Sequence, residues 1–158
     1  MIKEMLHGGS YLVPPESKEQ LDKAMRECDA AYTKSVVNRT DYESLLDKIY
    51  SFAKCLIAFA EDTDECAGYV CMYANDHINY RAYITLICVK KVYQGKHIGS
   101  SLIRACYRMA INEGMKTIRL EVLCQDTRAI EFYQNMGFTI IDKTEHGTNY
   151  MEAPLHMM

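Results

Sequence analysis

The chain has 158 residues, of which 49% are hydrophobic and 25% charged, and its formal net charge is −3. This length suits one domain with a real core, so a largely disordered or collagen-like chain is excluded. An acidic chain with one basic segment, from Arg81 to Arg108, is not expected to bind nucleic acid. No apolar run approaches the ~20 residues of a membrane span and no signal-peptide pattern is present, so we expect a cytoplasmic protein without membrane association.

The first half of the chain carries two helix signals followed by strand signals. The expected elements, in chain order, are helices near 16–34 and 41–53 and strands at 54–60 and 68–74. Capping boxes at Ser17–Gln20 and Thr40–Glu43 begin the two helices. The acidic residues 61–65 predict an exposed hairpin loop between the two strands.

The second half alternates strands and helices. The expected elements are a strand at 80–89, a helix from about 97–99 to Gly114, a strand at 117–123, a short helix capped by Asp126 and ended by Gly137, and strands at 138–141 and 149–153. With the two early helices, this order predicts a mixed sheet with helices on both faces.

The seven cysteines follow no metal or disulfide pattern. Their number is odd, no pair has CxxC spacing, and several lie in apolar runs, as Cys88 does. This pattern is typical of buried, reduced thiols, and we expect neither a disulfide framework nor a metal site.

The strongest local signal for a ligand is the strand–loop–helix segment around Val89. Gly95 and Gly99 bracket the turn into the helix, where free N–H groups and the helix dipole favour a bound phosphate. The spacing fits neither a P-loop nor GxGxxG. From these residues alone, a strand–helix turn without a ligand is an equally good interpretation.

The run from Ile87 to Leu102 resembles the central motif of the GCN5-related N-acetyltransferase (GNAT) superfamily, Gln/Arg-x-x-Gly-x-Gly/Ala after a strand. Gln94 and Gly99 match the outer positions, and His97 stands at the middle glycine. A second similarity runs from Asp126 to Phe138, where Asp126 replaces the usual Asn. The order and spacing of the pieces fit the superfamily over about 36–154, whereas 1–35 match it poorly.

The resemblance implies an α+β, three-layer α-β-α fold in one domain, 1–158. Its sheet would be mixed and largely antiparallel, with about six to seven strands, a central splay and helices on both faces. The sequence leaves a homodimer open.

The resemblance also implies acetyl-CoA as the acetyl donor and no metal. The pyrophosphate would lie on the amides of Gly95 to Ser100, with Lys90, Lys91 and Lys96 adding attraction. A backbone N–H near Ile87–Cys88 would polarise the thioester carbonyl. The cofactor-binding residues implied in this way are Ile87, Cys88, Val89, Gln94, Gly95, Lys96, His97, Ile98, Gly99, Ser100, Asp126 and Tyr133.

Two residues are catalytic candidates through the resemblance. Tyr133 matches the usual general acid, and Glu121 has the spacing of the catalytic glutamate in ribosomal-protein N-terminal acetyltransferases. Each has a plainer alternative: Tyr133 as a core aromatic, and Glu121 as an ion-pair partner of Arg119 or Lys116. Asp126 could contact the cofactor or serve only as a helix N-cap.

The function implied is direct transfer of an acetyl group to a primary amine of a small molecule or peptide, and the sequence does not identify the acceptor. One alternative is a non-catalytic acyl-CoA-binding or regulatory module of the same fold. A second is an unrelated nucleotide-binding domain, which would explain Gly99 but not the segment 126–138.

Overall fold

The computed structural model describes residues 4–6 and 10–156. The strands are β1 (Glu4–Leu6), β2 (Ser10–Val13), β3 (Lys54–Ala60), β4 (Cys66–Tyr73), β5 (Arg81–Val89), β6 (Thr117–Leu123), β7 (Thr139–Lys143) and β8 (Thr148–Pro154). The α-helices are α1 (Lys18–Cys28), α2 (Tyr42–Phe52), α3 (Ile98–Asn112) and α4 (Thr127–Asn135). Two short 3-10 helices are η1 (Asp29–Ala31) and η2 (Lys91–Tyr93).

The strands form one mixed sheet in the order β1-β2-β3-β4-β5-β6-β8-β7. β5 and β6 are parallel and pair over Arg81–Tyr83 and Thr117–Arg119. The ladders β1–β2, β2–β3, β6–β8 and β7–β8 are antiparallel. The mixed α+β architecture expected from the sequence is therefore confirmed. The sheet has eight strands because β1 and β2 precede α1, where no strand was predicted and the helices were expected to come first.

The chain divides into two compact units. Unit 1 comprises Met1–Cys71 and Leu86–Arg104, and unit 2 comprises Met72–Thr85 and Ala105–Met158. β4, β5 and α3 each contribute residues to both units.

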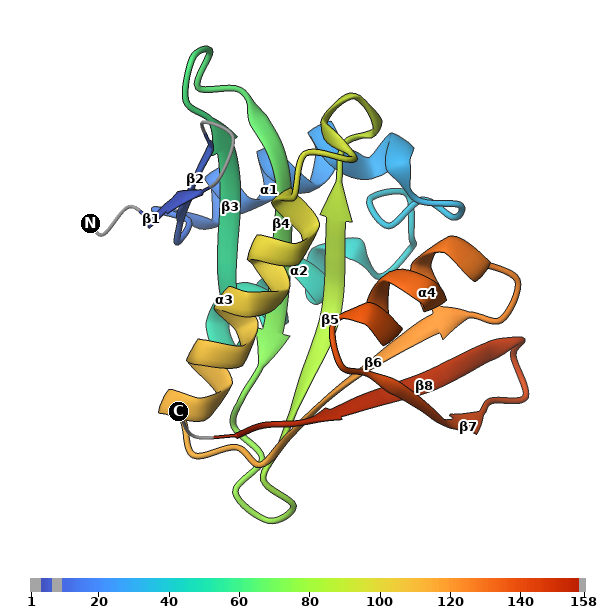
Figure 1. The fold of residues 1–158 in the computed structure, drawn as a ribbon. Coiled ribbons are helices and arrows are strands. Elements are labelled where there is room, and N and C mark those ends of the chain that lie inside the picture. The colour runs from blue at the N-terminus through green and yellow to red at the C-terminus, as the bar shows by residue number, and fades with distance from the viewer. Residues whose placement is uncertain (1–3, 7–9, 157–158) are drawn as a thin grey trace. The chain divides into compact units, whose positions relative to one another are not determined.

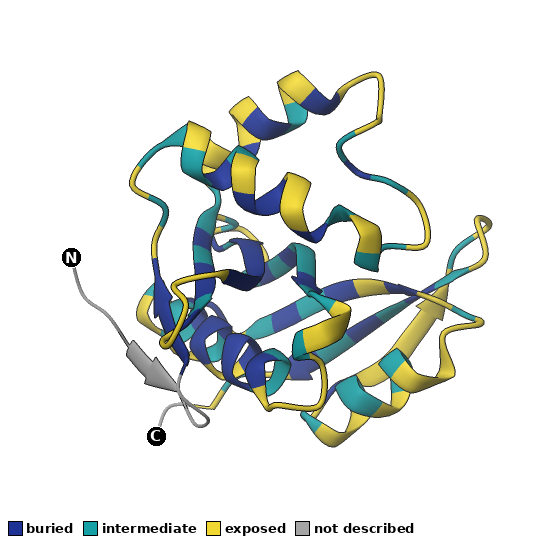
Figure 2. Ribbon diagram, turned by 90° about the horizontal axis from the view of Figure 1, so that it is seen from above, coloured by how far each residue is buried: buried dark blue, intermediate teal, exposed yellow. Residues whose placement is uncertain are grey.

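Unit 1 is built around the strands that α1 and α2 cover. These helices lie on one face of β3 and β4, and the first turns of α3 lie on the other (Figures 1 and 2). Each helix buries an apolar face, which includes Leu21 and Met25 of α1 and Ile49 of α2. Amphipathic periodicity therefore located both helices correctly.

Two details of unit 1 differ from the sequence prediction. The first helix ends at Cys28 rather than near residue 34, because the Asp29 carboxylate accepts hydrogen bonds from the backbone N–H of Val36 and Val37 and folds the chain into a loop. The prediction of a second capping box, at Thr40–Glu43, is wrong. Asp41 is the N-cap of α2, but its side chain caps nothing and instead pairs with Arg39 at 2.8 Å.

Unit 2 contains a two-faced sheet. Along β6, Ile118, Leu120 and Val122 are buried, while Arg119 and Glu121 alternate with them on the opposite face. α4 and β7 contain no buried residue (Figure 2). The aromatic anchor of this region is Phe138, which is 1% exposed.

The cysteines are free thiols, and six of the seven are buried, as the sequence predicted. Over the described residues, 4–6 and 10–156, no helix is long and apolar enough to cross a membrane.

Candidate active site

The end of β5, the loop that follows it and the first turn of α3, all in unit 1, contain most of the residues predicted to bind a cofactor. After Val89 the chain makes the 3-10 turn η2 and then an exposed loop, Gln94–His97, before α3 begins at Ile98. The Gln94 side chain donates a hydrogen bond to the Val89 carbonyl at 3.0 Å. The predicted Gln94 therefore ties the loop back to the end of its strand.

The loop takes its shape from two residues with left-handed backbone conformation. Gly95 has φ +80°, and a Cβ added there would meet nothing within 4 Å. His97 has φ 66°, which costs a residue with a Cβ about 1–2 kcal/mol. His97 stands at the middle glycine position of the motif that the sequence resembles, and the structure shows that this substitution carries backbone strain.

The first turn of α3 presents main-chain donors. The hydroxyls of Ser100 and Ser101 both donate to the His97 carbonyl, at 3.0 and 2.9 Å, so these side chains do not cap the N–H groups of the turn. N–H groups in a first helical turn have no acceptor within the helix and attract anions. This helix start therefore has the donor chemistry that a phosphate requires.

The basic residues near the loop are less available than the sequence suggested. The Lys90 ammonium lies 3.2 Å from the Glu65 carboxylate, which also accepts the Tyr93 hydroxyl at 2.9 Å. These hydrogen bonds, from Tyr93 and Lys90, lower the pKa of the exposed Glu65 carboxyl. Because Lys90 is already paired with Glu65, Lys96 is better placed than Lys90 to attract a phosphate.

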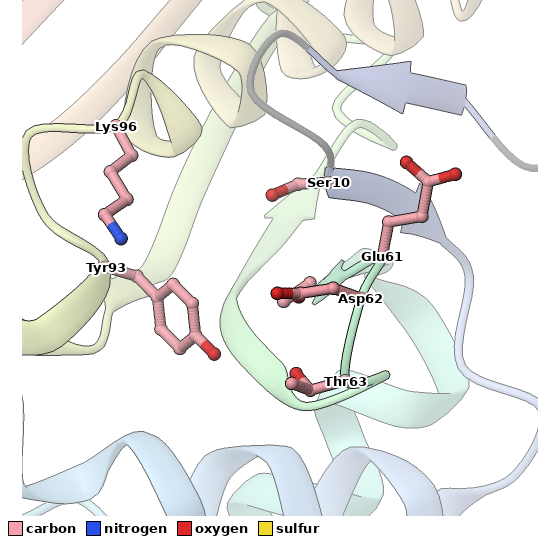
Figure 3. Close-up of a pocket in the computed structure, with 7 residues that line it drawn as sticks. Ser10, Glu61, Asp62, Thr63, Tyr93 and Lys96 are labelled. Carbon is pink, nitrogen blue, oxygen red and sulfur yellow. The ribbon is translucent and has the colours of Figure 1, made fainter.

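Lys96 and Tyr93 also border a cavity of about 590 Å³ beside the loop (Figure 3). The Lys96 ammonium lies over the Tyr93 ring, 5.6 Å from its centroid. The opposite wall contains Asp62, on the predicted hairpin loop, whose side chain reaches into the cavity (Figure 3). The acidic hairpin therefore faces the basic end of the loop and reduces its positive potential.

In unit 2, α4 carries the predicted general acid and the residue in place of the family's Asn. The Asp126 carboxylate accepts a hydrogen bond from the Ala129 N–H at 3.0 Å, so Asp126 is the N-cap of α4. Tyr133 is half-buried, with its ring edge-on to those of Phe132 and Phe138. Because α4 contains no buried residue, Tyr133 is not a core aromatic.

Glu121 lies on the more exposed face of β6 in unit 2. It accepts a hydrogen bond from the Thr148 hydroxyl at 2.7 Å, and Thr144 lies 2.6 Å from that hydroxyl. Arg119 pairs with Glu152 at 3.2 Å rather than with Glu121. The ion pair between Glu121 and Arg119, which was one alternative role for Glu121, is therefore not formed in the structure.

Tyr83 and Tyr150 accompany Glu121 on this face. Burial, followed by the charge of Glu121 and the nearby Tyr150, raises the pKa of Tyr83 to about 12. Tyr150 is the direct cross-strand neighbour of Glu121 on β8. Thr148 and Tyr150 were not predicted as site residues, and only the register of β8 against β6 reveals them.

Comparison with known proteins identifies the family. A family model described as the acetyltransferase (GNAT) family matches residues 21–138. The chain belongs to the GNAT family of acetyltransferases. The resemblance inferred from the two motifs is thereby confirmed, and the match begins earlier than the expected residue 36.

Two curated GNAT relatives illustrate the level of similarity. The N-alpha-acetyltransferase MAK3 of Arabidopsis thaliana is 27% identical over 93 residues, which is 58% of this chain and 48% of that protein. The thialysine N-epsilon-acetyltransferase of Bos taurus is 33% identical over 63 residues, or 40% of this chain and 37% of that protein. The chain thus spans about half or less of the length of these relatives.

Solved structures show the same fold at lower identity. The NatC complex bound to Gag peptide and CoA contains a chain that matches with a TM-score of 0.75 at 19% identity, covering 93% of this chain and 99% of that one. At this identity the likeness supports the GNAT fold.

Proposed function

We propose that this GNAT protein is an acetyl-CoA-dependent N-acetyltransferase that acts on a primary amine of a small molecule or peptide. The observation that carries the proposal is the loop between β5 and α3, where Gly95 and His97 are left-handed and lead directly into a helix start. This arrangement supplies N–H donors and a helix dipole suited to a pyrophosphate. A solved GNAT structure of the same fold is described as bound to CoA.

The proposed binding roles follow the strand and the loop. The amides of Gly95 to Ser100 would hold the pyrophosphate, and Lys96 would add attraction. The backbone of Ile87 to Val89 would pair with the pantetheine arm, and an N–H near Ile87–Cys88 would polarise the thioester carbonyl. Asp126 caps α4 through its carboxylate, so any contact with the pantetheine arm would be additional to this bond.

The proposed chemistry is direct attack without an acyl-enzyme. Glu121 would take a proton from the acceptor ammonium, directly or through water, so that the amine lone pair can bond to the thioester carbonyl carbon. As the carbon–sulfur bond breaks, Tyr133 would protonate the departing thiolate. Two similar proteins are described as N-alpha- and N-epsilon-acetyltransferases, which supports an amine acceptor without identifying it.

A screen of primary amines with acetyl-CoA, read out as free CoA thiol, tests the proposal. The panel should contain free peptide N-termini, lysine-like ε-amines and amino sugars, each compared with a reaction lacking protein. We expect thiol release above this background with at least one amine class.

A specific observation keeps one alternative, a non-catalytic acyl-CoA-binding or regulatory module. His97, whose backbone is strained, stands at the middle glycine of the motif, and Asp126, which caps α4, stands in place of the usual Asn. Tight acetyl-CoA binding without turnover across all amine classes would favour this module over the enzyme.

A further inference from the structure

Two tyrosines of unit 1, one half-buried and one fully buried, form a hydroxyl chain that ends on the backbone of β5. The hydroxyls of Tyr32, just after η1, and Tyr69, in β4, lie 2.8 Å apart. The Tyr32 hydroxyl also donates to the Ile87 carbonyl at 3.3 Å. Each phenol has one proton, and the carbonyl can only accept. The hydrogen bonds are therefore donated in one direction, from the Tyr69 hydroxyl to the Tyr32 hydroxyl and from there to the Ile87 carbonyl.

This hydroxyl chain is stable against titration. Tyr69 is fully buried and Tyr32 is half-buried. Burial raises the pKa of both phenols above the ordinary value. Both side chains thus remain neutral donors over the whole range in which an acetyl transfer would operate.

The residue after Ile87 is held from two further directions. The Cys88 thiol donates to the Cys28 carbonyl at 3.3 Å. A Cβ at Gly68 would stand 2.5 Å from the Cys88 carbonyl oxygen, so β4 approaches β5 here only because residue 68 is a glycine. The Ile87–Cys88 segment is therefore fixed by contacts with α1, β4 and the loop that follows η1.

The loop that bears Tyr32 is itself anchored. The Asp29 carboxylate holds the loop by accepting hydrogen bonds from Ser35 and Val36, at 2.6 and 2.8 Å.

We propose that Tyr32 is a positioning residue for acetyl transfer, held in place by Tyr69. This inference rests on the proposed function. Fixing the Ile87 carbonyl also fixes the direction of the Cys88 N–H, which belongs to the same planar peptide group and would polarise the thioester carbonyl. A hydrogen bond to a peptide carbonyl also polarises the peptide and strengthens its N–H as a donor.

The test is carbon-13 NMR of [1-¹³C]acetyl-CoA bound to the wild type and to Tyr32→Phe, Tyr69→Phe and Tyr42→Phe. Tyr42 is the matched control, because its buried hydroxyl in the same unit donates to Asp22, on α1. We expect binding to move the carbonyl resonance of the wild-type complex downfield. Tyr32→Phe should lose much of that movement while its dissociation constant stays within about threefold. Tyr69→Phe should lose less, because Tyr32 keeps its own proton, and Tyr42→Phe should lose none.

Turnover with any amine found in the screen provides the second readout. kcat of Tyr32→Phe should fall about five- to tenfold with little change in the KM for acetyl-CoA. A carbonyl resonance in Tyr32→Phe identical to that of the wild type, or equal losses in Tyr32→Phe and Tyr42→Phe, would overturn the positioning role. Failure of the wild type to bind acetyl-CoA would instead overturn the proposed function, and the inference with it.

Discussion

The loop before α3 in unit 1 and the β6–α4 region of unit 2 use different parts of the chain for their proposed roles. The loop works through its main chain, with left-handed residues at Gly95 and His97 and N–H groups at the start of α3. The β6–α4 region works through two side chains, Glu121 and Tyr133. Substitutions in the loop should therefore change cofactor affinity, whereas those in β6–α4 should change the rate.

The largest expected effect is a loss of acetyl-CoA affinity caused by a substitution at the start of α3. Gly99→His places a side chain in the first turn of α3, where N–H groups would contact the pyrophosphate. Loss of one or two hydrogen bonds to a charged group, at about 1.5–3 kcal/mol each, weakens acetyl-CoA binding by at least ~10-fold and up to ~100-fold or more. Isothermal titration of acetyl-CoA measures the loss. Affinity equal to that of the wild type would place the pyrophosphate elsewhere.

Tyr133→Phe tests the side-chain half. The ring packing against Phe132 and Phe138 is retained and only the hydroxyl is removed. Since general acid catalysis is worth roughly 10²–10⁴-fold, kcat should fall by at least about tenfold with the dissociation constant of acetyl-CoA unchanged. An unaltered kcat in an assay limited by chemistry would remove Tyr133 from the mechanism.

Glu121→Gln tests the second side chain of the β6–α4 region, the proposed base, and Thr148→Val is its matched control. Loss of the carboxylate should lower kcat about 10- to 100-fold at pH 7, and the deficit should shrink as the pH approaches the pKa of the acceptor amine. Thr148→Val removes the 2.7 Å hydrogen bond to Glu121 and the 2.6 Å contact with the Thr144 hydroxyl, keeps the carboxylate, and should cost a few-fold at most. A deficit in Glu121→Gln that does not depend on pH would argue against a base.

How far the sequence predicted these two regions depends on the distance over which each contact acts. The loop is local, so Gln94 and Gly99 identified it, and periodicity located α1 and α2. The hydroxyl pair of Tyr32 and Tyr69 joins residues 37 apart, and Glu121 meets Thr148 across 27 residues. Such contacts require strand register, which periodicity alone does not supply.

The backbone strain at His97 is a second feature that the sequence alone could not predict. The sequence showed a histidine at the middle glycine position but left its backbone conformation open. The structure shows a left-handed φ of 66°, which only the folded loop determines. The N-terminal strands β1 and β2 were missed because residues 1–15 lack the alternation that predicts a strand.

A smaller effect is expected at Asp29, which anchors the loop that bears Tyr32. Although burial opposes it, hydrogen bonds from Ser35, Val36 and Val37 lower the pKa of this carboxyl. The stabilisation is therefore present above the unfolded pKa of about 3.9 and is lost as the pH falls through the lower folded value. The melting temperature of Asp29→Asn should be lower than that of the wild type at pH 7, and the difference should narrow from about pH 5 to pH 3.

Asp47→Asn is the control for this experiment, because Asp47 forms an exposed ion pair with Lys18 at 2.7 Å. An exposed pair of this kind contributes little to stability, so the melting temperature should scarcely change. A pH-independent difference for Asp29→Asn would show that its carboxylate charge does not stabilise the loop.

The smallest expected effect is at His97. His97→Gly relieves about 1–2 kcal/mol of left-handed strain but adds chain entropy to the unfolded state. We expect acetyl-CoA to bind His97→Gly equally well or up to about threefold more tightly. If His97→Gly lost as much acetyl-CoA affinity as Gly99→His, the proposed difference between a tolerant position 97 and a phosphate-contacting position 99 would be wrong.

Thermal unfolding of the wild type with acetyl-CoA, ATP or NAD tests the central claim most directly. A ligand that binds only the folded state stabilises it by about 2.7 kcal/mol at a hundredfold excess over Kd, which raises Tm by roughly 5–10 °C in a chain of this size. We predict this rise with acetyl-CoA and not with ATP or NAD. No shift with millimolar acetyl-CoA, together with a clear shift with ATP, would contradict the account.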